Sequence, residues 1–593
     1  MAQAPRTIPE NSKHAVVSFD VLSDGKAIED KTQIMGISIS SELNRIPIAT
    51  IVIRDGNPSE SDFEVSNDKA FEPGKEITIK LGRDSKNQVA FKGLVVKQRI
   101  SISDQAESNL IIECRDKADK MTRGRFSKYY EKKKDSDIIK TLIGNHGLSN
   151  KIDATTLKHD ELVQYHCSDW DFMLSRAEAN AMLVSVSEGK VSVLKPKTSS
   201  EPVLKLLYGA TLLEFDAELD ARNQWAKVKA RSWDYKSHKL FEAEASSVSF
   251  GEAGNLSGKK LADTVGPKEY ELAHGGHARK EELKAWADGC LLRSRLSKIR
   301  GSARILVGST KVVPMDMVEF QGVGKRFNGK VFVTGVRHEV ANGSWDTIIQ
   351  FGLSPEWFAF KHDDIMDRPA SGLLPAMRGL QVGKVVKIEQ DPDGEDRIQV
   401  RLPILDASAA GVWARVSALD AGKKRGTFFR PEIDDEVIVG FINDDPRDPI
   451  VLGMLHSSKL PAPLQGIKNT NHEKGIFTRS EMKVLFNDET KTITIETPAG
   501  NSIVMDEKGK TIIIKDQNKN EMVMEGAGIT LKSPKEITVD AGSKMTLKAK
   551  ADLILDATNI KIKAKSQLSA QGAMVALKAQ GIAEIKGSLV KIN

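Results

Sequence analysis

The carboxyl-terminal fifth of the chain carries its most regular pattern of apolar and polar residues. From about Val484 to the end, short apolar–x–apolar segments repeat along the sequence. Side chains alternate between the two faces of an extended strand, so both apolar residues of each segment share a face, while an intervening residue such as Thr538 or Lys561 lies opposite. A single chain of such strands cannot cover its own apolar face. The pattern therefore predicts strands that stack or associate with other copies.

The spacing of these segments predicts how the strands connect. Before Met522 they start nine or ten residues apart and are joined by turn sequences such as Asn487-Asp488, whereas from Met522 onward they start seven or eight residues apart. The shorter connections leave no room for hairpins, so each strand is expected to bend a corner into the next face. Three copies wound around one axis satisfy this pattern. The predicted axis residues are Ile529, Leu531, Ile537, Val539, Met545, Leu547, Leu553, Leu555, Ile560 and Ile562.

The amino-terminal half is predicted to be mainly β with a few helices. A helix is expected over 136–145 with Ser136 as its N-cap, and a second from Ser168, which has capping-box spacing to Asp171. A third is expected over about 277–300, closed by Gly301. Alternating apolar residues predict strands at 14–21, 46–54, 76–81, 91–102, 110–114, 181–194, 226–233, 303–307, 317–321 and 330–339.

A compact β segment lies between two stretches that read as linkers. The Pro- and Gly-containing stretch 355–379 predicts a hinge, and 457–473 has little periodic pattern. Between them, five short strands suit a small OB-like barrel, at 383–388, 397–402, 411–416, 436–442 and 450–453. We therefore divide the chain into 1–370, 376–457, a linker 458–476, and the strand ladder 477–593.

Composition narrows the function classes. The 593 residues include 87 basic and 81 acidic side chains, a balance that gives no argument for nucleic-acid binding. From Ala527 onward, however, eleven lysines face five acidic residues. Such lysines either keep a stack soluble and protect its edges, or attract it to a membrane surface. No apolar run reaches the length of a membrane span and no signal peptide is visible, so synthesis in the cytoplasm is expected.

Candidate chemistry is sparse. The hydrolase, metalloprotease and P-loop motifs are absent, and the segment 322–325 lacks the first glycine of a P-loop. His274 and His277 have no further metal ligands beside them, while 443–448 is better explained as a tight turn. The three cysteines, including Cys167, are far apart and are expected to be buried thiols without a disulfide. No catalytic, cofactor or metal site is expected, and the chain is predicted not to be an enzyme.

Three stretches carry a resemblance to a known family. The segments Asp391-Pro392-Asp393-Gly394, Trp413-Ala414-Arg415-Val416 and Pro431-Glu432-Ile433-Asp434-Asp435-Glu436-Val437 resemble the OB-type domain of VgrG proteins and phage baseplate spikes. The stretch from Glu161 to Met173 is similar to the hub domain of the same family, and the ladder resembles its trimeric β-helical needle. The resemblance implies a hub domain of small β-barrels with helices, an OB-fold barrel and a C-terminal needle.

The resemblance also implies a role and a set of partners. The chain would be a homotrimeric spike at the end of the inner tube of a contractile injection system, assembled into the particle and driven through a target membrane. The hub would contact an Hcp-like hexameric tube protein and baseplate proteins, and effector cargo is possible. A PAAR-type tip protein would dock at the blunt end of the needle, on Val590, Ile592 and Asn593.

Two other functions stay open at this level. A tail-associated cell-wall hydrolase would need acid, base or nucleophile residues, and a receptor-binding fibre would keep the needle but bind a surface receptor. No motif separates a type VI secretion apparatus from an extracellular injection particle or a phage tail.

Overall fold

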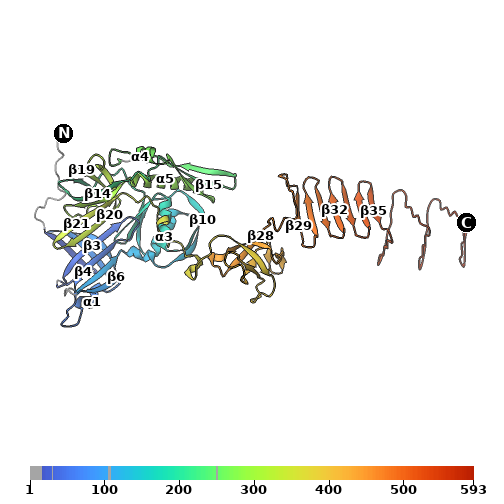
Figure 1. Ribbon diagram of the computed structural model, residues 1–593, viewed down its shortest axis with the longest axis horizontal. Helices are drawn as coiled ribbons and strands as arrows, with labels where there is room; N and C mark the ends of the chain where they lie inside the picture. The colour runs from blue at the N-terminus through green and yellow to red at the C-terminus, as the bar shows by residue number, and fades with distance from the viewer. Residues whose placement is uncertain (1–15, 30, 104–107, 249–250, 593) are drawn as a thin grey trace. The chain divides into compact units, whose positions relative to one another are not determined.

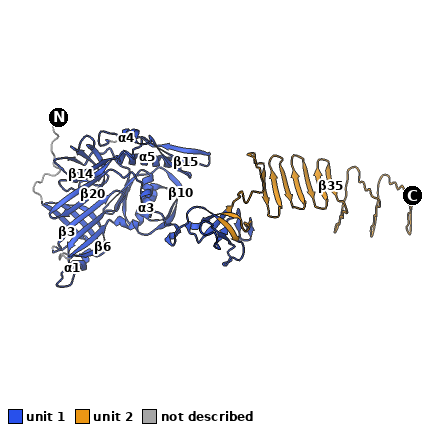
Figure 2. Cartoon of the chain, in the orientation of Figure 1, with its two compact units in different colours: residues 1–382, 387–428, 439–452 blue, residues 383–386, 429–438, 453–593 orange. Residues whose placement is uncertain are grey.

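Strands dominate both of the compact units into which the chain divides, as the computed structural model in Figure 1 shows. The structure describes residues 16–29, 31–103, 108–248 and 251–592. One unit comprises residues 1–382, 387–428 and 439–452, and the other comprises residues 383–386, 429–438 and 453–593 (Figure 2). The predicted fold class, mainly β with minor α, is confirmed.

A thirteen-stranded sheet forms the framework of the first unit. Its edge-to-edge order is β14 (Leu212–Leu219), β18 (Ile299–Ile305), β21 (Ser344–Phe351), β20 (Gly329–Ala341), β3 (Ile34–Glu42), β4 (Ile48–Arg54), β7 (Ser108–Arg115), β6 (Lys86–Ile102), β5 (Glu76–Arg83), β1 (Val17–Ser23) and β2 (Lys26–Ala27). Off this path, β19 (Met317–Gln321) pairs with β20 and with β13 (Leu204–Leu207).

The sheet joins two groups of strands, β14 to β20 and β3 to β2 in the edge-to-edge order, through the pairing of β20 with β3. Antiparallel pairing of β20 with β3 sets Val336 opposite Ser41 and Val340 opposite Ile37. On either side of this junction lies a separate apolar core, one around β3 to β7 and one around β18 to β21. The alternation in β4 shows the cause, because Ala49, Ile51 and Ile53 are fully buried while the residues between them are not.

Helices and small sheets cover the rest of this unit. The helices are α1 (Glu64–Asn67), α2 (Asp135–Asn145), α3 (Asp169–Ala179), α4 (Gly258–Val265), α5 (Lys280–Leu296) and α6 (Phe358–Lys361), with 3-10 turns at Lys69–Phe71, Lys117–Thr122, Pro369–Gly372 and Ile442–Asp444. The small sheets pair β8 (Phe126–Lys134) with β10 (Lys158–Cys167), β11 (Leu183–Ser187) with β12 (Lys190–Leu194) and β9 (Ser149–Ile152), and β15 (Lys227–Asp234) with β16 (Lys239–Glu244) and β17 (Glu269–His274).

The predicted helix starts are half right. Ser168 caps α3, because its side chain accepts a hydrogen bond from the backbone N–H of Asp171 at 3.1 Å. Ser136 does not cap α2, which starts at Asp135 and has Lys134 at the N-cap position. Ser136 lies in the first turn of α2, and its backbone N–H donates a hydrogen bond to Oγ1 of Thr155, outside the helix, at 3.1 Å. The serine prediction failed because tertiary contacts of Asp135 fix the first turn.

Asp135 is the centre of a buried charged network. Its carboxylate is 1% exposed and accepts hydrogen bonds from Arg176 Nε at 2.7 Å and Asn180 Nδ2 at 2.9 Å, and a ring nitrogen of His159 lies at 2.9 Å. Burial alone would raise the pKa of Asp135. The hydrogen bonds from His159 and Arg176 outweigh burial and hold this pKa below its ordinary value. The network therefore ties α2, β10 and α3 together with an ionised carboxylate.

The first half of the predicted hinge is fixed to the first unit. Arg293 donates to the carbonyl oxygens of Ser354 at 3.0 Å and Glu356 at 2.7 Å, and also pairs with the buried Glu178. Glu178 Oε2 accepts a hydrogen bond from the backbone N–H of Phe358 at 2.7 Å. The hinge prediction is therefore wrong here, because charged side chains from α3 and α5 satisfy the backbone of the connecting segment.

The predicted helix end at Gly301 is also wrong. Helix α5 ends at Leu296 with Ser297 as its C-cap, and Gly301 lies within β18 opposite Ala217. A Cβ atom on Gly301 would overlap the backbone carbonyl oxygen of Asp216. The glycine is needed for the close approach of two strands and not for a helix cap.

This close approach makes a testable prediction. Gly301→Ala is expected to lower the free energy of unfolding of the first unit by about 1–3 kcal/mol, because backbone must move to admit the methyl group. Gly144→Ala is the control. Gly144 lies in α2, and a Cβ atom added there would meet open space, so this substitution should stabilise the protein by about 0.5–1 kcal/mol. Thermal unfolding of both variants checks the contrast, and equal midpoints would contradict it.

Five strands close the OB-type barrel. The barrel order is β22 (Gln381–Lys387), β23 (Ile398–Arg401), β24 (Val412–Val416), β28 (Pro449–Met454) and β27 (Glu436–Phe441), and a hairpin, β25 (Ala421–Gly422) with β26 (Arg425–Gly426), forms a separate small sheet. Val385, Ile398, Val400, Ala414 and Val439 are fully buried in it. The sequence-based barrel prediction is confirmed, with each strand within two residues of its expected start.

Candidate functional site

A seven-stranded antiparallel sheet in the second unit carries the candidate site. Each strand pairs with the next along the chain, so the strands lie side by side in sequence order (Figure 1). They are β29 (Glu473–Phe477), β30 (Lys483–Asn487), β31 (Thr492–Glu496), β32 (Ser502–Asp506), β33 (Thr511–Lys515), β34 (Glu521–Glu525) and β35 (Gly528–Lys532). All seven are five residues long, which gives a ribbon of constant width.

Side chains in the turns hold the register of this sheet. After β32, the carboxylate of Asp506 accepts the backbone N–H of Gly509 at 2.7 Å. After β33, Asp516 accepts the backbone N–H groups of Asn518 at 2.8 Å and Asn520 at 2.9 Å. Because a one-residue slip would move every side chain to the other face, these turns decide which residues share a face.

The register collects apolar side chains on one face, in two columns that cross the strands. The first column contains Phe486, Ile493, Met505, Ile512, Met524 and Ile529. The second contains Val484, Ile495, Ile503, Ile514, Met522 and Leu531. We call these twelve residues the apolar face. Its side chains stay partly or largely exposed among the residues that the structure describes, and Ile529 is 68% exposed.

The opposite face of the same sheet differs in chemistry. Its central column is mostly apolar: Thr494 lies between Leu485 and Val504, and the column continues through Ile513 and Val523 to Thr530. Ion pairs flank this column, between Lys483 and Glu496 at 2.9 Å and between Lys515 and Glu521 at 2.9 Å. The opposite face therefore combines charged pairs with a mostly apolar column, whereas both columns of the apolar face are apolar throughout from β30 to β35.

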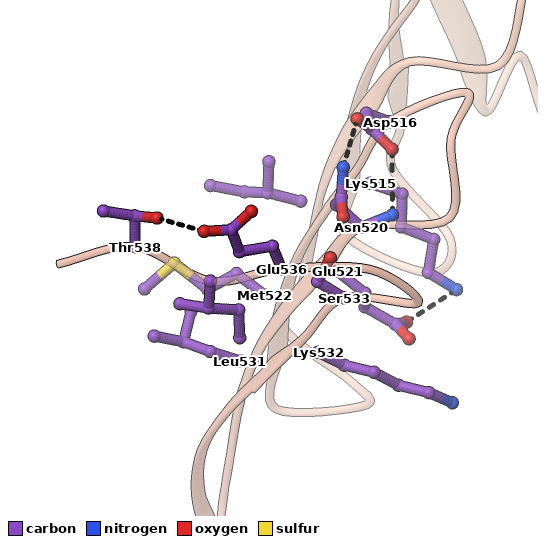
Figure 3. Close-up of a pocket in the computed structure, with 12 residues that line it drawn as sticks. Lys515, Asp516, Asn520, Glu521, Met522, Leu531, Lys532, Ser533, Glu536 and Thr538 are labelled. Atoms are coloured by element: carbon purple, nitrogen blue, oxygen red, sulfur yellow. Dashed lines mark hydrogen bonds and ion pairs between the residues drawn. The ribbon is translucent and has the colours of Figure 1, made fainter. Parts of the chain in front are cut away.

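Two shallow grooves run along the apolar face. One, of about 510 Å³, is lined by Ile493, Met505, Ile512 and Met524 among others. The other, of about 430 Å³, lies at the end of the sheet and has Ile514, Met522, Leu531 and Ile537 in its wall. Figure 3 shows Met522 and Leu531 side by side in it, with the Lys515–Glu521 ion pair at its rim. Contiguous exposed apolar surface of this kind marks an interaction site.

The predicted axis residues fall into two groups, those before Lys532, which lie in a strand, and those after it, which do not. Ile529 and Leu531 lie on the apolar face in β35. Beyond them, the described residues 533–592 contain no strand, and Ile537, Val539, Met545, Leu547, Leu553, Leu555, Ile560 and Ile562 are all exposed. Val590 and Ile592 are exposed too, while Asn593 lies outside the described residues. Their place at a shared axis stays a prediction.

One connection differs from the expectation. The sequence predicts no hairpin after Met522, yet β34 and β35 form one through Gly526 and Ala527. Gly528, with φ of 138°, begins the next strand in a conformation that other residues rarely adopt. Two residues suffice for a hairpin when glycine is available, so the expectation of no hairpin after Met522 is wrong for this connection.

The remaining candidate residues are accounted for by local structure. The Cys167 thiol is buried as predicted, and burial raises its pKa. The pKa values of Cys114 and Cys290 are raised to about 12, also chiefly by burial. His277 Nδ1 lies 3.5 Å from Asp234, and Asp445 pairs with Arg447 in a turn at 2.7 Å. Among the residues that the structure describes, no three His, Cys, Asp or Glu side chains form a metal-like cluster. No described helix is both long and apolar enough to cross a membrane.

Two family models match the chain. Residues 381–456 match the type VI secretion system and phage-baseplate injector OB domain. Residues 13–342, more than half of the chain, match the Alg8 N-terminal domain. The chain belongs to the Alg8 N-terminal domain family. Its barrel is thus an injector OB domain, and the resemblance to VgrG-like spike proteins is confirmed.

Named relatives support the same identification. The type VI secretion system spike proteins VgrG1b and VgrG1a of Pseudomonas aeruginosa are each 32% identical over 114 residues. That stretch is 18% of this chain, and 15% and 18% of the two relatives, so the chain matches less than a fifth of their length.

Solved structures show only distant likeness to this member of the Alg8 N-terminal domain family. A prophage MuSo2 43 kDa tail protein from Shewanella oneidensis has a TM-score of 0.44 at 9% identity, covering 57% of this chain and 98% of that one. The Francisella PdpA-VgrG complex has a TM-score of 0.39 at 9% identity, with 88% and 80% covered.

Proposed function

We propose that the chain is a structural spike at the end of the inner tube of a contractile injection system, and that it works as a homotrimer. Three copies would turn their apolar faces toward one axis and bury them against each other. The opposite faces, with their Lys–Glu pairs, would remain in water. The single observation that carries this proposal is the apolar face of β30–β35, whose side chains stay partly or largely exposed in the described residues of the second unit.

The mechanism we propose is mechanical. Strands of β29–β35 repeat at about 4.7–4.9 Å, so a stack of them forms a rod whose backbone groups are paired along its length. A rod with a shared apolar core resists bending better than separate sheets. When the sheath contracts, this rod would be pushed through the target membrane. No group of this chain needs to carry out a chemical reaction, and we propose that it is not an enzyme.

The proposed partners follow from the VgrG-like identification. The hub of the first unit would contact an Hcp-like hexameric tube protein and baseplate proteins. Val590 and Ile592, both exposed, would seat a PAAR-type tip protein, and effector cargo could travel with the spike. The chain would be assembled into the particle in the producing cell and delivered outside it or into the target cell.

Imaging of assembled particles tests this proposal. Particles purified from producing cells, with the chain carrying an amino-terminal label, are expected to show three labels at one end of the inner tube. A receptor-binding fibre would instead place the label at the particle's periphery, and a cell-wall hydrolase would degrade peptidoglycan in purified form. Either outcome would contradict the structural spike.

A further inference from the structure

The charge of the second unit changes sign along the chain. Residues 473–526, which contain β29–β34, have eight basic and ten acidic side chains. Residues 527–593 have eleven lysines and five acidic side chains. The first six strands of the sheet are thus slightly acidic, whereas the segment from Ala527 onward, which begins with β35, carries an excess of six positive charges.

The two segments also differ in how their cations are neutralised. In the sheet, lysines pair with carboxylates across neighbouring strands or turns, as Lys474 does with Asp488, Lys491 with Glu507 at 3.1 Å, and Lys515 with Glu521 at 2.9 Å. Within the described residues 527–592, the one ion pair joins Lys586 to Glu584. Most of the terminal lysines therefore keep their charge available for an external anion.

These lysines alternate with the apolar residues of the ladder. Lys561 and Lys563 are next to Ile560 and Ile562, and Lys591 stands between Val590 and Ile592. In an extended strand, neighbouring residues point to opposite faces, so burial of the apolar residues turns these lysines outward. We call Lys548, Lys561, Lys563, Lys565, Lys578, Lys586 and Lys591 the distal lysine face; all seven are exposed.

We propose that the distal lysine face binds the phosphate headgroups of an anionic membrane surface; this rests on the proposed function, which brings that segment to a bilayer. Lysine ammonium groups are compact, hydrated charges, and clusters of them adsorb to anionic lipid over about one Debye length. In a trimer each position occurs three times around the axis, so the ring of charge meets a lipid surface from any rotation. Solubility alone would not require the sheet to be acidic while the end is basic.

Vesicle co-sedimentation of the full-length protein tests this inference. The protein is expected to bind vesicles that contain phosphatidylglycerol, to ignore vesicles of phosphatidylcholine alone, and to lose binding as salt is raised. The triple variant Lys561→Gln, Lys563→Gln, Lys565→Gln should bind at least tenfold more weakly, because each lysine near an anionic surface contributes roughly fivefold.

The sheet supplies a matched control. Lys508, Lys510 and Lys519 lie in its turns, and replacing all three by Gln removes the same charge while the distal lysine face stays intact. This control should bind within about twofold of the natural protein. Equal losses in the two variants, or equal binding to both vesicle types, would overturn the proposal.

The mass of both variants in native buffer separates this inference from the proposed function. If the protein is a trimer but does not bind anionic vesicles, the proposed lipid-binding role of the distal lysine face is overturned and the proposed spike function is not. A natural protein that is a monomer would overturn the spike, whatever the vesicles show.

Discussion

Ile493→Asp is expected to abolish the trimer. Ile493 lies in the middle of the apolar face, between Phe486 and Met505 on the neighbouring strands. In three associated copies, the substitution would place three carboxylates in one layer of a shared apolar core. Each buried and unpaired charge costs several kcal/mol, and the three would also repel each other. Mass measurement in native buffer should therefore find monomers, and the thermal transition of the second unit should disappear.

Thr494→Asp is the matched control for this prediction. Thr494 is the next residue in β31 but belongs to the opposite face, where it stands between Leu485 and Val504. Thr494 is half-buried, but in the proposed trimer its face lies outside the shared core, so the trimer should keep its mass and lose much less stability than with Ile493→Asp. If both variants dissociate equally, or if neither does, the apolar face is not the surface that the copies share.

Asp135→Asn is expected to destabilise the first unit by about 3–5 kcal/mol at neutral pH. The substitution removes the negative charge that Arg176 contacts at 2.7 Å in the buried network and leaves the guanidinium with Glu282 at 3.4 Å. Breaking a buried ion pair by removing one partner is costly because the other charge stays in a poorly solvated place. Asp137→Asn is the control, since Asp137 is exposed in the same helical turn and should cost less than about 1 kcal/mol.

The effect of Asp135→Asn should also depend on pH. The folded protein holds the pKa of Asp135 below that of the unfolded chain, so the carboxylate stabilises the fold fully at pH values above the unfolded pKa of about 4. As the pH falls through that value, the unfolded chain binds a proton first and the contribution is lost. Thermal unfolding should therefore show a gap between natural protein and variant that is constant near neutrality and narrows below about pH 4. A gap that widens in acid would contradict the network.

Local alternation was sufficient to predict most strands but not their long-range pairing. The barrel strands were predicted because Val385, Val400 and Val439 sit in short alternating runs bounded by turn residues. Strand β3 was missed, although Ile37 and Ile39 show the same buried alternation. Its pairing with β20, about 300 residues away, could not be inferred from either segment alone. The two-residue period shows which side chains share a face of a strand, but it does not show which strand pairs with it.

The errors came from residues whose tertiary contacts outweigh local preference. Ser136 has the chemistry of a cap, but Asp135 fixes the start of α2 through Arg176. Gly301 has the chemistry of a helix end, but it is needed where β18 approaches β14. In both cases the deciding neighbour lies far away in the sequence, so no local pattern could have revealed it.

The sequence predicted the part of the candidate site that follows from the alternation of apolar and polar residues along each strand. The residues of the apolar face follow from the period of two, and the register of β30–β35 places them in common columns. What covers that face could not be predicted in the same direct way, since the cover would come from other copies of the chain. The positions from Ile537 to Ile562 stay predictions for the same reason.

The mass of the full-length protein in native buffer tests most directly whether three copies bury one apolar core. We predict a single species of three times 65.1 kDa that persists on dilution. A stable monomer of 65.1 kDa, with its apolar face still in water, would contradict the trimeric spike.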